Sequence, residues 1–172
     1  MKKKAFTLIE LLIVIALLGI LSLGLLAAID PFEQFKKGSD TSMSNLVSEI
    51  YQATIRHYAN TITVPWVGSS PVQYKGLYNG DGATMLNNII SGGELKQDFI
   101  QLAGSGKLSK INFRGEETTD GVKVAVCFSP ESKSFDKNPA TKYKDEFGQN
   151  EDTGSTCKNK PGGTQDCYWC VK

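Results

Sequence analysis

The chain has 172 residues, of which 40% are hydrophobic and 22% charged, and its formal net charge is +1 at pH 7. This length allows one modest globular domain after an N-terminal apolar segment is subtracted. Outside the N-terminal lysines and Glu10, the charges of the acidic and basic residues nearly cancel, and the basic residues form no stripe. The composition therefore gives no support to a nucleic-acid partner.

Residues 6–29 form an apolar run in which Glu10 is the only charged residue. As a helix this run would be about 36 Å long, enough to span a bilayer with some tilt. The lysines at 2–4 precede it, so the positive-inside rule predicts a cytoplasmic N-terminus and an exported remainder. A carboxylate deep in lipid costs about 2.5–3.5 kcal/mol, so Glu10 calls for a partner, a function or an interfacial position.

The N-terminus differs from a secretory signal peptide, which has a shorter apolar core followed by a small-residue cleavage site. An uncleaved signal anchor fits the length of the run but does not explain Glu10. The order of features is a lysine-rich leader, the small residue Ala5, the sequence Phe-Thr-Leu-Ile-Glu at 6–10 and an unbroken apolar run. This order resembles the N-termini of type IV pilins and type II secretion pseudopilins over about the first 30 residues.

The resemblance implies that a prepilin peptidase cuts on the cytoplasmic side, between Ala5 and Phe6, and N-methylates Phe6. Ala5 stands where the family usually has glycine. The resemblance further implies that Glu10 neutralises the terminal amine of a neighbouring subunit during assembly. Such a pair is stronger at low dielectric constant than in water, and either charge alone there is penalised.

The domains expected from this resemblance are a leader at 1–5, a transmembrane assembly helix at 6–29 and an extracytoplasmic pilin-like domain at 30–172. The expected partners are identical or related pilin subunits, the prepilin peptidase, the inner-membrane assembly machinery and membrane lipid. The expected location is the cell membrane, with a single pass and the C-terminal domain outside, and then a surface pilus or pseudopilus.

A second helical region follows the membrane segment. Asp30 before Pro31 predicts an N-cap with proline at the first helical position, after a kink or short unwound stretch. Apolar residues then recur every three or four positions from 39 to 60, which predicts an amphipathic helix with Asp40 as its candidate cap. His57 is the only histidine and is predicted to be solvated or at a helix end.

The rest of the chain predicts short helices followed by strands. Turn signals at 61–83 indicate a loop with one short strand, and helices are expected at 84–91 and 94–103. Residues 108–115 and 121–129 alternate apolar and polar side chains, and "CYWCVK" at the end suits a third strand. The long polar stretch at 130–166, before this third strand, is expected to be functional, cross-linked or mobile. A long N-terminal helix on a small antiparallel sheet is the pilin architecture, so the predicted fold class is α+β.

The four cysteines lie in the last part of the chain, and an even number in an exported domain predicts disulfide bonds. A four-cysteine zinc site is the alternative, and four cysteines allow three disulfide pairings. The Cys-x-x-Cys pair lacks the βαβ pattern of a redox motif. The residues concerned are Cys127, Cys157, Cys167 and Cys170.

The sequence shows no Ser/His/Asp, Cys/His or phosphate-binding constellation, so it predicts a structural filament subunit that is not an enzyme and needs no cofactor or metal. The alternative is a membrane-anchored extracytoplasmic binding or enzymatic domain with an uncleaved anchor. Calcium binding by the acidic stretch at 144–152 stays open. The sequence does not separate adhesion or motility pili from secretion pseudopili or DNA-uptake filaments.

Overall fold

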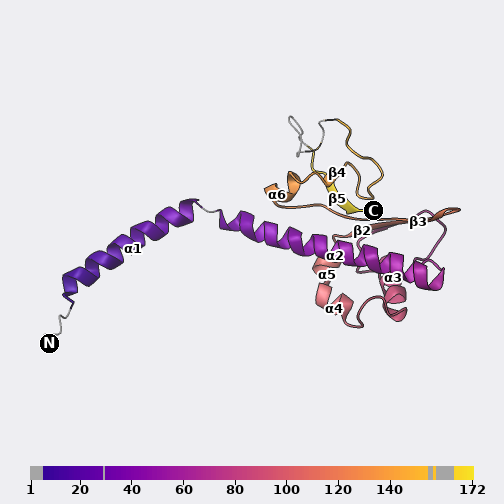
Figure 1. The fold of residues 1–172 in the computed structure, drawn as a ribbon, viewed down its shortest axis with the longest axis horizontal. Helices are drawn as coiled ribbons and strands as arrows, with labels where there is room; N and C mark the ends of the chain where they lie inside the picture. Colours follow the sequence, from indigo (N-terminus) through magenta and orange to yellow (C-terminus); the bar gives the residue numbers. More distant parts are fainter. Residues whose placement is uncertain (1–5, 29, 155–156, 158–164) are drawn as a thin grey trace. The chain divides into compact units, whose positions relative to one another are not determined.

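The computed structural model describes residues 6–28, 30–154, 157 and 165–172 (Figure 1). Contacts divide the chain into two compact units, one ending at Phe35 and one running from Lys36 to Lys172. The first unit contains helix α1, Leu8–Ala28. Its residues Leu8–Leu25 have a mean hydropathy of 2.7, and in the described part of the chain this is the one helix long and apolar enough to cross a membrane.

Helix α2, Pro31–Thr61, begins as predicted. An Asp30 carboxylate oxygen accepts the Glu33 N–H at 3.3 Å, and Pro31 occupies the first helical position, where its missing N–H costs nothing. A separate amphipathic helix was expected to start near residue 39, and this was wrong, because α2 runs without a break from Pro31 through that point. Asp40 therefore lies inside α2 and does not cap it.

The second unit is built on a five-stranded antiparallel sheet with strand order β1-β2-β3-β5-β4. The strands are β1 Val72–Lys75, β2 Asn112–Thr118, β3 Gly121–Phe128, β4 Thr141–Tyr143 and β5 Tyr168–Val171. The short helices are α3 Gly80–Ser91, α4 Phe99–Ala103, α5 Ser105–Leu108 and α6 Lys133–Asp136. The arrangement is the predicted α+β class, a long apolar helix followed by a second helix and a small antiparallel sheet.

The hydrophobic core joins one face of the sheet to α2 and α3. Helix α2 contributes a stripe that includes Met43, Val47 and Ile50, spaced as the sequence pattern requires for one helix face. Strand β3 contributes Val124 and Val126, while its neighbour Lys123 is exposed, because alternate strand residues point to opposite faces.

Three local features differ from the sequence-based expectation, and the first is the helix expected at 94–103, which is shorter and forms α4 over Phe99–Ala103. Residues 105–108 form helix α5, so β2 starts at Asn112 and extends to Thr118, which leaves a tighter hairpin turn before Gly121. The polar stretch after residue 130 contains α6 and the edge strand β4, which is only three residues long and carried no alternating pattern. The C-terminal strand β5 was predicted correctly.

His57 lies near the end of α2, which is one of its two expected positions, but it is buried, with 8% of its surface exposed, and not solvated. Gly92 closes over it, and a Cβ atom there would lie 2.7 Å from the imidazole Nδ1. Glu94 holds this loop against α2 by accepting hydrogen bonds from Arg56 at 2.9 Å and from Asn60. These two hydrogen bonds lower the pKa of the Glu94 carboxyl. The end of α2 is thus covered by the loop that follows α3.

Asp40 is a buried carboxylate that ties α2 to the segment after β3. Its two oxygens accept the backbone N–H of Glu131 at 3.1 Å, and one of them accepts that of Ser132 at 2.8 Å. Asp40 is 2% exposed and Ser132 fully buried, so water cannot replace these hydrogen bonds. The contact therefore joins parts of the chain that are far apart, because Glu131 is 91 positions and Ser132 is 92 positions after Asp40.

We therefore expect Asp40→Ala to lower the free energy of unfolding of the globular unit by about 2–4 kcal/mol, since it leaves two backbone donors unpaired. The measurement is urea unfolding of the full chain in mild detergent, followed by tryptophan fluorescence. Asp98→Ala is the control, because Asp98 is exposed and makes no side-chain cap hydrogen bond at α4. Equal stability of the two variants would contradict the assigned role of Asp40.

Candidate assembly site at the N-terminal helix

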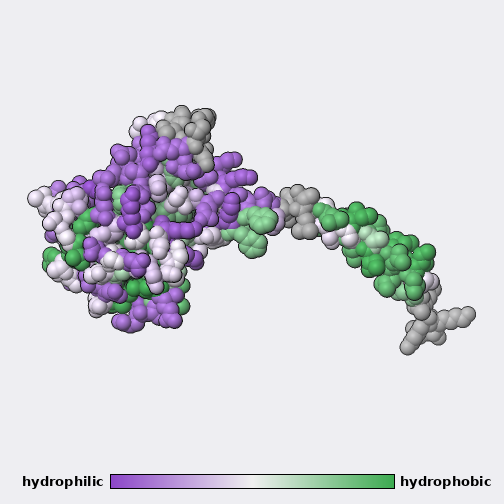
Figure 2. Space-filling view, turned by 180° about the vertical axis from the view of Figure 1, so that it is seen from behind, coloured by the Kyte–Doolittle hydropathy of each residue, from purple (hydrophilic) through white to green (hydrophobic). Residues whose placement is uncertain are grey.

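Helix α1 exposes apolar side chains on every face. The large apolar residues from Phe6 to Leu25 are between 47% and 84% exposed, and Figure 2 shows the segment as nearly continuous hydrophobic surface. A helix that is apolar all round is stable only when lipid or other helices cover it. The folded single chain therefore leaves α1 to be covered by a membrane, by other subunits, or by each in turn.

Glu10 and Thr7 form a capping box at the start of α1. One Glu10 oxygen, Oε2, accepts hydrogen bonds from the Thr7 backbone N–H at 2.9 Å and from the Thr7 hydroxyl at 2.8 Å. The Thr7 hydroxyl oxygen in turn accepts the Glu10 N–H at 3.3 Å. This reciprocal pattern satisfies two backbone donors that a helix start otherwise leaves unpaired.

The capping box also fixes where the carboxylate lies. It turns the Glu10 side chain back toward the first residues of the helix, next to Phe6, which is 84% exposed. Among the described residues, both hydrogen bonds to the carboxylate reach Oε2, so Oε1 remains available as an acceptor for an outside donor. The positive end of the helix dipole favours a negative charge at this point.

Thr7 is a site residue that the sequence reasoning missed. The signal was present, because Thr-x-x-Glu before an apolar run is the sequence form of a capping box. The structure places Phe6 and Glu10, which were predicted, beside Thr7. Ala5 and the three lysines before it lie outside the described residues.

Thr7→Ala should weaken the first turn of α1, since loss of a threonine cap costs roughly 1 kcal/mol of helix stability. In lipid nanodiscs, the backbone amides of residues 8–10 should then exchange with solvent several-fold faster. Ser22→Ala is the matched control: it also removes a hydroxyl from α1, but one that bonds to the Leu18 carbonyl in mid-helix. Unchanged exchange in the Thr7→Ala chain would show that the cap contributes nothing.

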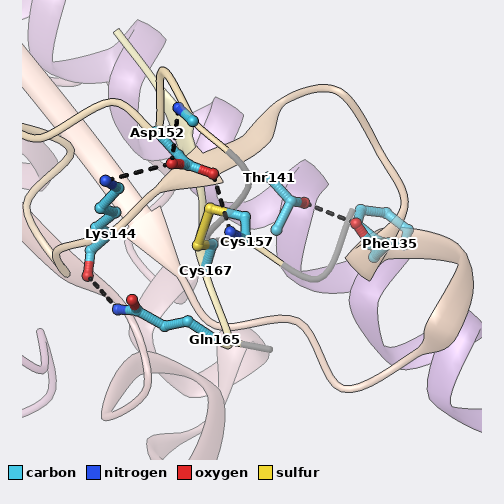
Figure 3. The surroundings of a disulfide bond; sticks show 8 residues. Phe135, Thr141, Lys144, Asp152, Cys157, Gln165 and Cys167 are labelled. Carbon is cyan, nitrogen blue, oxygen red and sulfur yellow. Dashed lines mark hydrogen bonds and ion pairs between the residues drawn. A yellow bond between two sulfur atoms is a disulfide. The ribbon is translucent and has the colours of Figure 1, made fainter. Parts of the chain in front are cut away.

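The predicted disulfides are present and use all four cysteines. Cys127 pairs with Cys170, and Cys157 pairs with Cys167. Around the second bridge, the buried Asp152 accepts the Cys157 N–H at 2.9 Å and lies 3.3 Å from the Lys144 ammonium (Figure 3). In the residues that the structure describes, no cluster of three or more His, Cys, Asp or Glu side chains is arranged to hold a metal ion.

A nearby acidic loop has its own structural use. Asp145 accepts the backbone N–H groups of Phe147 at 2.9 Å and Gln149 at 3.0 Å, and also that of Asn150. Burial works against the charge of Asp145, but these hydrogen bonds outweigh it and lower its pKa. Asp145, one of the carboxylates of the acidic stretch at 144–152 considered for calcium, therefore stabilises the backbone of its own loop.

Comparison with known proteins gives a family match at the N-terminus. The family model described as the prokaryotic N-terminal methylation motif matches residues 1–26. Searches of curated proteins and of solved structures found no significant match. The match covers the leader, the capping box and most of the apolar helix, which are the features from which the resemblance was inferred. The chain therefore carries the N-terminal methylation motif that is the signature of type IV pilins and pseudopilins.

Proposed function

We propose that the chain is a prepilin, the precursor of a structural subunit of a type IV pilus or a type II secretion-like pseudopilus. The observation that carries this proposal is the combination of the methylation motif with a carboxylate held at the start of an apolar helix that is exposed on every face. The motif marks a family of structural proteins whose members assemble with one another after processing by a prepilin peptidase.

In this proposal the peptidase cuts between Ala5 and Phe6, and Phe6 becomes the N-methylated first residue. The new terminus is a cation at the membrane boundary, one helical turn from Glu10. The capping box already holds Glu10 beside this position. The carboxylate of one subunit then pairs with the amine of the next, which sets the register between neighbouring α1 helices.

In this proposal the protein occupies two locations, first the cell membrane as a precursor and then the filament as a subunit. The precursor spans the cell membrane once through α1, with its N-terminus in the cytoplasm and residues 30–172 outside. Assembly transfers α1 from lipid to a bundle of identical helices, so its apolar side chains are covered in both states. Because lipid tails and leucine side chains are equally apolar, this transfer costs little, and the Glu10 pair decides which arrangements are allowed.

Processing gives the direct test. Mass spectrometry of assembled protein should show an N-terminal peptide that begins at methylated Phe6. Ala5→Arg should block the cut and leave the five-residue leader attached in the membrane fraction, whereas Ala5→Gly, which keeps the site small, should be processed fully. Intact Met1 in filaments, or normal processing of Ala5→Arg, would refute the proposal and favour an uncleaved anchor.

A further inference from the structure

The first turns of α2 carry two aromatic side chains that the folded chain leaves uncovered. Phe32 is 77% exposed and Phe35 is 78% exposed. They are three residues apart on one helix, so they lie on the same side of it. Lys36 and Lys37 follow at once and are also exposed. The order along the chain is therefore apolar span, aromatic pair, lysine pair and then the polar globular unit.

The length of α1 puts this aromatic pair close to the membrane surface. Its 21 residues rise about 31 Å, which matches a hydrocarbon core of about 30 Å. Helix α2 starts at Pro31, so Phe32 lies within about 12 Å of chain from the last residue of α1. The headgroup layer is roughly 5–8 Å thick on each side. This short connection therefore lets Phe32 reach the headgroup layer, and Phe35 follows about 4.5 Å further along α2.

The chemistry of the segment suits that layer. Aromatic rings are favoured where hydrocarbon meets headgroups, and lysine stems extend along apolar surface while their ammonium groups reach lipid phosphates. Juxtamembrane lysines are attracted to anionic lipid over about a Debye length. Of the two, Lys37 is the cleaner probe, because Lys110 and, more weakly, Lys36 lower the pKa of Glu131 in the globular unit.

We propose that Phe32, Phe35 and Lys37 form an interfacial anchor that binds the lipid headgroup layer and holds the start of α2 at the membrane surface before assembly. The occupant is anionic lipid, as a continuation of the surface that covers α1. This inference rests on the membrane insertion in the proposed function but needs neither cleavage nor filaments. Its consequence is that a subunit entering a filament must first release this second lipid contact.

The test uses the full, uncleaved chain at low density in vesicles containing phosphatidylglycerol. All four native cysteines are in disulfides, so one introduced cysteine gives a single reactive thiol for a spin label. Labels at Gln34→Cys and Asn45→Cys report on the start and the middle of α2, where both side chains are exposed. A label at Ser22→Cys reports independently whether α1 is inserted.

We expect a water-soluble nickel relaxant to reach the label at position 34 several-fold less than the label at 45. The double change Phe32→Ser/Phe35→Ser should abolish that protection, and Lys37→Glu should reduce it in a salt-dependent way. Ile62→Ser, which removes an equally exposed apolar side chain elsewhere, should have no effect.

Equal access at 34 and 45, with the label at 22 still protected, would overturn the anchor and leave the proposed function intact. Access at 22 would instead show that α1 is not inserted, which contradicts the proposed function and the anchor together. Protection at 34 that grows with protein density and is independent of lipid charge would show that a second copy of the chain covers the two rings, and would likewise overturn the proposal.

Discussion

Chains that carry Glu10→Ala should insert and fold normally but form no filaments. Glu10 lies in α1, and its only described partner is Thr7, so its loss leaves the globular unit untouched. Removing a carboxylate from the apolar run should even favour insertion by about 2.5–3.5 kcal/mol. What disappears is the partner for the Phe6 amine of the next subunit, and one unpaired charge in an apolar bundle costs about 3–5 kcal/mol. That cost recurs with every subunit added.

The capping box gives Glu10 a second role, and two variants separate the roles. Glu10→Gln keeps an oxygen that can accept both Thr7 hydrogen bonds but loses the charge. Thr7→Ala keeps the charge but loses the cap. If pairing with the amine drives assembly, Glu10→Gln fails like Glu10→Ala, and Thr7→Ala assembles with modest impairment. The measurements are immunoblots of membrane fractions and the yield of sheared filaments. Normal filaments from Glu10→Gln would show that the charge of Glu10 is not needed for assembly and that Glu10 acts only as a helix cap.

The features that the sequence predicted well depend on residues close together in the chain. The apolar run and the Asp30–Pro31 helix start each follow from composition or spacing over a few positions. The alternating residues of β3 belong to the same class, because successive strand residues point to opposite faces of the sheet, and the C-terminal run "CYWCVK" suited a strand without alternating. The capping box at Thr7 was readable in the same way.

The features that were missed depend on distant residues. Asp40 was taken as a helix cap because it stands at the start of the periodic apolar pattern at 39–60, yet its partners lie more than 90 positions further on. His57 lies near a helix end as expected, but its burial was missed because nothing nearby in the sequence predicts that Gly92 packs over it. Strand β4 is short and polar, and it forms only because β5 offers it an open edge. Local patterns carry no record of such contacts.

The disulfide pairing shows the same limit. The sequence allowed three pairings, and strand register selects between them: β3 and β5 pair antiparallel, with Cys127 directly opposite Cys170. Their Cα atoms are 4.2 Å apart, close to the spacing of a cross-strand neighbour. This leaves Cys157 for Cys167, ten positions away. The two bridges therefore close loops of very different length, which gives them different expected effects on stability.

Removing the Cys127–Cys170 bridge should destabilise the globular unit more than removing Cys157–Cys167. In the chain-entropy model, a bridge spanning 43 positions contributes about 4 kcal/mol and one spanning 10 positions about 2.7 kcal/mol. The longer bridge also fastens β5, whose register with β3 covers only three residue pairs and which in turn supports β4. Its loss therefore releases both the C-terminal strand and the edge strand.

The test compares two double variants, Cys127→Ala/Cys170→Ala and Cys157→Ala/Cys167→Ala, in the full chain in mild detergent. Each removes one disulfide and two sulfur atoms, so the number of lost side-chain atoms is matched, and urea unfolding followed by tryptophan fluorescence gives both free energies. Trp169 lies in β5 opposite Phe128, so its emission should change at lower urea concentration than that of Trp66 only when the longer bridge is absent. A larger loss of stability from the shorter bridge would contradict this, because it would mean that the segment near Cys157, and not the β3–β5 pairing, holds the C-terminal part of the chain in place.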